Sequence, residues 1–167
     1  MNLPPATSDR FWPLSRRQGL WALMGLGLAA LVPARAAELE LPLSESLPDE
    51  VARAVKAGQP LVVMVSLHRC PWCEMVRNNY LAPMRAREGL QVVQVDMLGP
   101  HMTRAPDGEE LTHDELVRQW GVTMAPTLLF LGRDGQELAD RLVGGSPDFY
   151  SAYLDGRLER ARKALTA

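Results

Sequence analysis

The segment LVVMVSLHRCPWCEMV, residues 61–76, decides the fold of this chain. Residues 61–67 form an almost unbroken apolar run rich in β-branched side chains, which is typical of a central strand buried on both faces. Pro71 suits the first position of a helix, because its missing N–H would be unpaired there anyway. The segment therefore predicts a buried strand that leads straight into a helix.

Helix and strand patterns alternate along the rest of the chain. Helices are predicted at residues 48–57, 70–80 and 112–120 and from 146 onward, and strands at 61–67, 90–97, 127–131 and 137–143. Residues 37–47 are either a short strand or an extended lead-in, and residues 99–111 are predicted to be an exposed loop. This order predicts an α/β fold whose central mixed β-sheet is flanked by helices on both faces.

Several side chains carry specific expectations. Pro83 is expected to prevent the second helix from continuing. Phe149, Tyr153 and Leu158 are expected to turn toward the core from the last helix. Met84, Met97, Met124 and Trp120 are also expected to fill the core.

The first 36 residues are typical of a cleavable export signal. They contain Arg10, Arg16 and Arg17, an uncharged apolar run at 20–32, and the cleavage site Ala34-Arg35-Ala36. The run is shorter than the roughly 20 residues of a membrane span, so cleavage after Ala36 is preferred to an uncleaved anchor. Arg16-Arg17 also resembles a twin-arginine signal, which leaves the export route open. A periplasmic location is expected.

Residues 37–167 have the length of one domain. Residues 1–36 carry four arginines and one aspartate, so their removal changes the formal net charge from −2 to −5. A mildly acidic domain without a basic cluster is a poor binder of nucleic acid, and no such partner is expected. Nothing in the sequence resembles an additional dimerisation domain, so a monomer is expected.

Cys70 and Cys73 are the only cysteines of the chain, so any intramolecular disulfide joins them. At a helix N-terminus, unpaired N–H groups and the helix dipole stabilise a thiolate and lower the pKa of the thiol. We therefore expect Cys70 to be the nucleophile and Cys73, one turn further on, to be the resolving thiol. This chemistry needs no cofactor and no metal beyond the redox-active disulfide itself.

The residues beside the cysteines suggest supporting roles. His68 and Arg69 place potential positive charge near Cys70, which would stabilise its thiolate. Trp72, which follows Pro71, is expected to be exposed and to offer an apolar contact to extended partners. Glu74 either transfers a proton for the resolving thiol or is an ordinary acidic residue of a first helical turn.

The chain from about residue 47 to 165 resembles exported thioredoxin-like thiol–disulfide oxidoreductases. Three features carry the resemblance: the strand that leads into the Cys-Pro-Trp-Cys motif, the segment Met124-Ala125-Pro126-Thr127 before a strand, and the Asp134-Gly135 hairpin followed by Gly144-Gly145. The resemblance implies a thioredoxin fold in which Pro126 is a cis-proline beside the disulfide. It also implies that the Ala125 backbone binds substrate.

The chain departs from thioredoxin itself at three places. Met64 stands where thioredoxin has a buried aspartate, Arg69 stands where it has a tryptophan, and Pro71-Trp72 stands between the cysteines where it has Gly-Pro. The acid/base helper that thioredoxin provides for its resolving thiol is therefore absent from this chain.

The resulting expectation is a periplasmic oxidoreductase that exchanges disulfides with protein substrates, acting as a reductant. By resemblance, a membrane thiol reductase could supply its electrons. The alternatives are a protein-disulfide oxidase, a client-holding chaperone, and a carrier of copper or zinc that uses both cysteines. His68, His101 and Met102 are the residues that could complete such a soft-metal site.

Overall fold

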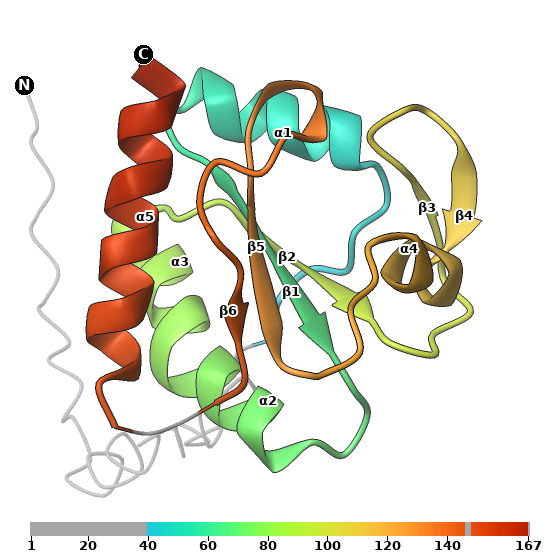
Figure 1. Cartoon of the computed structure of the whole chain (residues 1–167), viewed down its shortest axis with the longest axis horizontal. Coiled ribbons are helices and arrows are strands. Elements are labelled where there is room, and N and C mark those ends of the chain that lie inside the picture. The colour runs from blue at the N-terminus through green and yellow to red at the C-terminus, as the bar shows by residue number, and fades with distance from the viewer. Residues whose placement is uncertain (1–39, 146–147, 167) are drawn as a thin grey trace, which may run out of the picture. The chain divides into compact units, whose positions relative to one another are not determined.

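A four-stranded mixed sheet lies at the centre of the computed structural model, which describes residues 40–145 and 148–166 (Figure 1). Its strands are β1 (Leu61–Ser66), β2 (Val92–Asp96), β5 (Thr127–Leu131) and β6 (Leu142–Val143), in the spatial order β2-β1-β5-β6. β1 pairs parallel with β2 and antiparallel with β5. All six residues of β1 are buried, which confirms that the apolar run is a central strand.

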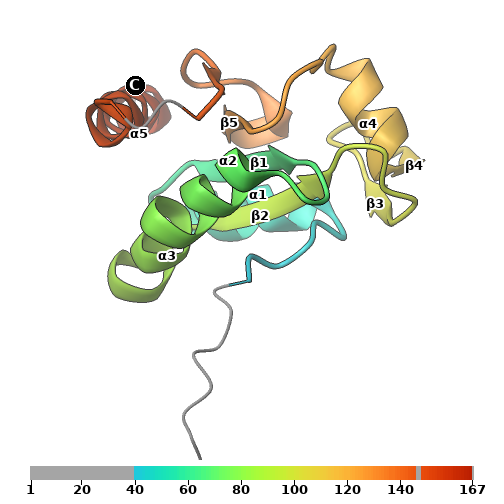
Figure 2. The same ribbon diagram turned by 90° about the horizontal axis from the view of Figure 1, so that it is seen from below.

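Helices cover both faces of this sheet. One face packs on α2 (Pro71–Val76), α3 (Ala82–Glu88) and α5 (Tyr150–Thr166), and the other packs on α1 (Leu47–Lys56) and α4 (His113–Gln119). Successive strand residues point to opposite faces, so Met64 belongs to the first core cluster and Val63 and Val65 to the second. Both views place α5 and α4 at opposite ends of this arrangement (Figures 1 and 2). The predicted α/β architecture is confirmed.

The prediction of an exposed loop at residues 99–111 is wrong in part, because this segment contains a small hairpin. Its strands are β3 (Met102–Arg104) and β4 (Glu110–Thr112), which pair antiparallel with Thr103 opposite Leu111. Only the middle residue of each strand is buried. With only one inward-pointing side chain per strand, the sequence shows no alternating apolar pattern here. The polar residues of the segment therefore led to the prediction of a loop.

Pro83 does not end the second helix. A π-helical segment, η1 (Arg77–Leu81), joins α2 to α3, and the Ala82 N–H donates to the Arg77 carbonyl five residues back. Pro83 then stands near the start of α3, where the absence of an N–H is tolerated. The helix continues to Glu88 and ends at Gly89, whose φ of 68° favours glycine.

The last helix is rotated relative to the prediction. Leu158 is buried, as predicted, but Phe149 and Tyr153 are 75% and 54% exposed, and Tyr150 and Leu154 are buried instead. The reason is that Phe149 has a φ of 61° and precedes the helix, which begins at Tyr150. The expected start of this helix at residues 146–147 lies outside the described residues.

Three smaller expectations also met a clear outcome. Met124 is exposed, because it lies in the loop before β5 rather than in the core. Leu43 makes a single bridge to Gln94, so residues 41–46 are an extended lead-in to α1 rather than a strand. Of the strand predicted at 137–143, only β6 and a bridge from Glu137 to Leu131 are formed.

Within residues 40–145 and 148–166, no helix has the length and apolar character needed to cross a membrane. The predicted export signal, residues 1–36, lies outside the described residues.

Candidate active site

The two cysteines lie at the edge of the sheet where β1 ends. Arg69, with a φ of 55°, turns the chain from β1 into α2, and Cys70 is the N-cap residue of that helix. Cys70 and Cys73 form a disulfide with their Cα atoms 5.2 Å apart. The Cys73 N–H donates to the Cys70 Sγ at 3.1 Å. A helix N–H therefore points at the sulfur that would carry negative charge after reduction.

The two sulfur-bearing residues differ in burial. Cys73 is fully buried in the core cluster that also contains Met64 and Val76. Cys70 is half-buried and packs against the rim of that cluster. An external thiol or disulfide can therefore reach Cys70 and cannot reach Cys73 without a structural change.

The loop before β5 lies at the same edge of the sheet, because β1 and β5 run antiparallel. The Ala125–Pro126 peptide bond is cis, which is the geometry that the resemblance implied. Pro126 is buried, and its carbonyl accepts the Gly144 N–H at 2.8 Å. A Cβ atom added to Gly145 would lie 3.0 Å from Trp72 Cβ and 3.5 Å from Pro126 Cγ. The active site is therefore formed by three segments that lie next to one another, residues 70–73, 125–126 and 144–145.

Three exposed apolar side chains belong to this meeting point. Trp72 is 51% exposed, as predicted, and Met124 and Val143 are exposed to a similar extent. Val143 pairs with Thr127, one residue after the cis-proline. We call Trp72, Met124 and Val143 the apolar rim. All three of these side chains are apolar and exposed.

A cavity of about 610 Å³ opens beside Cys70. Its lining includes the predicted neighbours His68, Arg69 and Glu74, all of which are exposed. Asp96 and His101 also line it, from the end of β2 and the loop that follows. The structure thus brings together the predicted residues and adds polar groups from β2.

Arg77 also lines this cavity and was missed by the sequence analysis. Its Nε donates to Gln94 Oε1 at 3.1 Å and its Nη2 donates to Ser66 Oγ at 3.4 Å. The Gln94 Nε2 in turn donates to Asp96 Oδ1 at 2.7 Å. The available signal was its spacing of four residues from Cys73, which places both on one helix face.

Within the described residues, no close group of potential metal ligands includes Cys70 or Cys73, which are joined in the disulfide. Among the residues that the structure describes, one group of three potential ligands lies close together, namely Asp96, His101 and His113, and it contains no cysteine. His113 is fully buried, its Nδ1 accepts the Asp96 N–H at 3.0 Å, and its other ring nitrogen lies 2.9 Å from the Ser44 carbonyl. Both ring nitrogens are thus already hydrogen-bonded, which leaves none for a metal ion.

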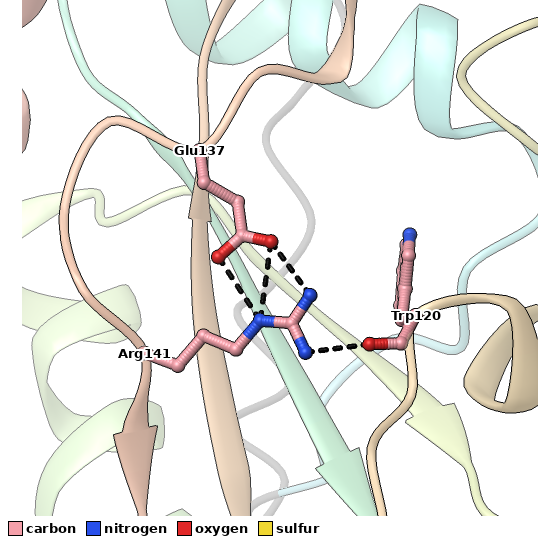
Figure 3. Close-up of polar contacts among 3 residues, drawn as sticks. All are labelled: Trp120, Glu137 and Arg141. Carbon is pink, nitrogen blue, oxygen red and sulfur yellow. Dashed lines mark hydrogen bonds and ion pairs between the residues drawn. The ribbon is translucent and has the colours of Figure 1, made fainter.

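The loop that carries Pro126 is held at its start by Arg141 (Figure 3). The Arg141 Nη1 donates to the Trp120 carbonyl at 2.7 Å, where α4 ends. Its Nε and Nη2 donate to the Glu137 carboxylate at 2.7–3.1 Å. The hydrogen bonds with Glu137 raise the pKa of Arg141, so this side chain stays charged. The clamp ties the end of α4 to the β5–β6 connection and was also missed by the sequence analysis.

Comparisons with known proteins identify the fold. The family model described as a thioredoxin-like domain matches residues 47–155. A DsbH oxidoreductase structure matches with a TM-score of 0.50 and 22% identity, over 76% of this chain and 86% of that one. A poplar thioredoxin h matches with a TM-score of 0.47 and 18% identity, over 68% and 94%. Oxidised mitochondrial thioredoxin 3 from Saccharomyces cerevisiae matches with a TM-score of 0.43 and 20% identity, over 70% and 94%. No curated protein sequence matches the chain.

Proposed function

Because this chain belongs to the thioredoxin-like family, we propose that it is a thiol–disulfide oxidoreductase that exchanges disulfides with protein substrates through Cys70 and Cys73. One observation carries the proposal. The disulfide at the start of α2 joins a half-buried cysteine, Cys70, to a fully buried one, Cys73, and it lies beside the loop of Ala125 and Pro126.

In the reducing direction, the Cys70 thiolate attacks one sulfur of a substrate disulfide. The other substrate sulfur leaves as a thiolate and takes a proton from water, and Cys70 is left in a mixed disulfide. Cys73 loses its proton and attacks the Cys70 Sγ, which releases the second substrate thiolate and re-forms the Cys70–Cys73 disulfide. Two electrons pass to the substrate, and the reverse sequence oxidises substrate thiols.

Substrate binding falls to the groups around the disulfide. The Ala125 backbone, next to Pro126, offers hydrogen bonds to an extended substrate segment, and the apolar rim contacts its side chains. Burial of Cys73 keeps the resolving thiol away from other oxidants until the mixed disulfide has formed.

The proposal places this enzyme in the periplasm, exported by residues 1–36 and cleaved after Ala36. There it acts as a monomeric reductant, and a thiol reductase of the membrane restores its dithiol. The support for this part is the sequence of the N-terminal segment and the mild acidity of the remaining domain, which makes a protein substrate more suitable than nucleic acid.

The test is reduction of a protein disulfide by excess dithiothreitol, with and without the enzyme. Wild type should accelerate the reduction, and Cys70→Ser should abolish the acceleration. In a separate reaction without dithiothreitol, pre-reduced Cys73→Ser should accumulate a mixed disulfide with the substrate. Acceleration that survives Cys70→Ser contradicts the mechanism. An inactive wild type that binds one copper or zinc ion tightly supports a carrier instead.

A further inference from the structure

We propose that Arg77 is a positioning residue of the redox site, whose charge stabilises the Cys70 thiolate and makes the Cys70–Cys73 couple more oxidising. The inference rests on the proposed function and deepens it, because it concerns the balance between reduction and oxidation at the same disulfide.

The first support is position. Cys70, Cys73 and Arg77 are spaced by three and four residues, which places them along one face of a helix. The Arg77 N–H donates to the Cys73 carbonyl, so the helical turn between them is intact. Arg77 and Cys70 line the same cavity.

The second support is the way in which the guanidinium is held. Gln94 and Ser66 accept its hydrogen bonds, and both are neutral. None of the ion pairs within the described part of the chain involves Arg77. Its side chain is half-buried, so solvent screens its charge less than that of an exposed residue.

The other charged and titratable groups around the cavity either affect the Cys70 thiolate more weakly than Arg77 or carry negative charge that offsets the charge of Arg77. Glu40, His68, Arg69, Glu74 and His101 are exposed. Asp96 is half-buried and opposes Arg77, although its carboxylate accepts a hydrogen bond from Gln94. On the other side of the disulfide, residues 121–126 contain no charged side chain.

The redox consequence follows from the charge of each state. The disulfide is neutral and gains little from a nearby cation, whereas the reduced site carries a thiolate at Cys70. Arg77 therefore stabilises the reduced state selectively. A couple whose reduced form is stabilised has a higher reduction potential.

The experiment compares Arg77→Met with Arg87→Met, which removes the same charge from an exposed position on α3. The pH dependence of Cys70 alkylation gives the thiol titration. Equilibration of the disulfide with two molecules of glutathione, yielding the dithiol and glutathione disulfide, gives the potential. We expect Arg77→Met to raise the midpoint of the titration by about 0.5–1 pH unit. It should also lower the equilibrium constant for reduction by about threefold to tenfold, where tenfold corresponds to about 30 mV.

Further variants separate charge from packing. Arg77→Lys should restore most of both values, because the charge is kept. Gln94→Glu places a carboxylate against Arg77 and should shift both values in the same direction as Arg77→Met. It provides an independent test if Arg77→Met folds poorly. Asp96→Asn should shift both in the opposite direction.

Identical titrations and potentials for Arg77→Met and Arg87→Met would overturn the inference and leave the oxidoreductase activity standing. If Arg77→Met cannot be measured, the absence of a shift in Gln94→Glu overturns it. An unreactive Cys70 in the reduced wild type would overturn both the inference and the proposed function.

Discussion

At the scale of single residues, the site depends on how closely the backbone approaches Trp72. Gly145 provides that approach, since a Cβ atom there would lie only 3.0 Å from Trp72 Cβ, with Pro126 Cγ in ordinary contact at 3.5 Å. Nothing in the spacing of Gly144 and Gly145 along the chain predicts which of them meets the tryptophan. Only the pairing of β6 with β5 brings residue 145 over the active site.

Gly145→Val should therefore impair substrate docking while leaving the sulfur chemistry intact. The added side chain must displace Trp72 or the cis-proline loop, and we expect kcat/KM for a protein disulfide to fall by about tenfold, which is about 1.4 kcal/mol. The alkylation rate of reduced Cys70 should stay unchanged. Gly156→Ala is the matched control, because a Cβ there meets no atom within 4 Å in the middle of α5. It should leave kcat/KM unchanged and stabilise the helix by about 0.5–1 kcal/mol.

At the scale of elements, a buried polar network joins α4, β2 and the lead-in to α1. The Asp96 N–H donates to His113 Nδ1, so the neutral ring carries its proton on Nε2 and donates to the Ser44 carbonyl. The Ser44 hydroxyl donates to the buried Glu50 carboxylate and also lies 3.0 Å from the Thr103 hydroxyl. This network fixes the end of β2, which forms one wall of the cavity beside Cys70.

Replacing His113 tests this network. His113→Phe keeps an aromatic ring but leaves the Asp96 N–H and the Ser44 carbonyl without this partner, so we expect a loss of about 2–4 kcal/mol in the free energy of unfolding. His101→Phe changes the exposed ring whose centroid lies 5.8 Å away, and it should cost almost nothing. Equal urea denaturation midpoints for the two variants would show that the network contributes no stability.

The Arg141 clamp makes a second prediction for the elements. Arg141→Met removes the bonds to Glu137 and to the Trp120 carbonyl, and we expect a loss of about 1–2 kcal/mol in stability together with a looser cis-proline loop. Arg118→Met breaks an ion pair with Asp114 whose arginine is mostly exposed, so its effect should be near zero. Hydrogen exchange of residues 121–126 should accelerate in Arg141→Met alone. Unchanged exchange there would contradict the positioning role of the clamp.

The elements also show why sequence patterns reached some features and missed others. The strands β1 and β5 and the helix α4 are confirmed because their signals are local; the start of α4 is fixed by Thr112 and Glu115, which bond reciprocally. The β3–β4 hairpin was missed because each of its strands buries a single side chain. The helix across Pro83 and the register of α5 depend on backbone that departs from regular geometry. Arg77 and Arg141 were missed because their partners Gln94 and Trp120 are 17 and 21 residues away.

At the scale of the whole molecule, strand order explains why the site exists. β1 lies between β2 and β5. The end of β1 is next to the end of its parallel neighbour β2 and next to the start of its antiparallel neighbour β5. The disulfide therefore has the polar cavity on the β2 side and the cis-proline loop on the β5 side. The sequence motifs predicted the cysteines and the proline as site residues. The cavity between the disulfide and β2 depends on the strand order of the sheet, which the motifs do not contain.

The redox potential of the site is linked to the stability of the entire fold. Oxidised and reduced protein, each folded and unfolded, form a thermodynamic cycle, so a change that acts only in the folded state alters the potential and the stability difference by the same free energy. If Arg77→Met lowers the equilibrium constant for reduction by threefold to tenfold, the unfolding free energy of the reduced form should fall relative to the oxidised form by about 0.6–1.4 kcal/mol. Urea denaturation of both forms, for wild type and variant, measures this difference. A shift in potential without the matching change in stability would mean that Arg77 acts on the unfolded chain, and its place in the cavity that Cys70 also lines would then have no redox role.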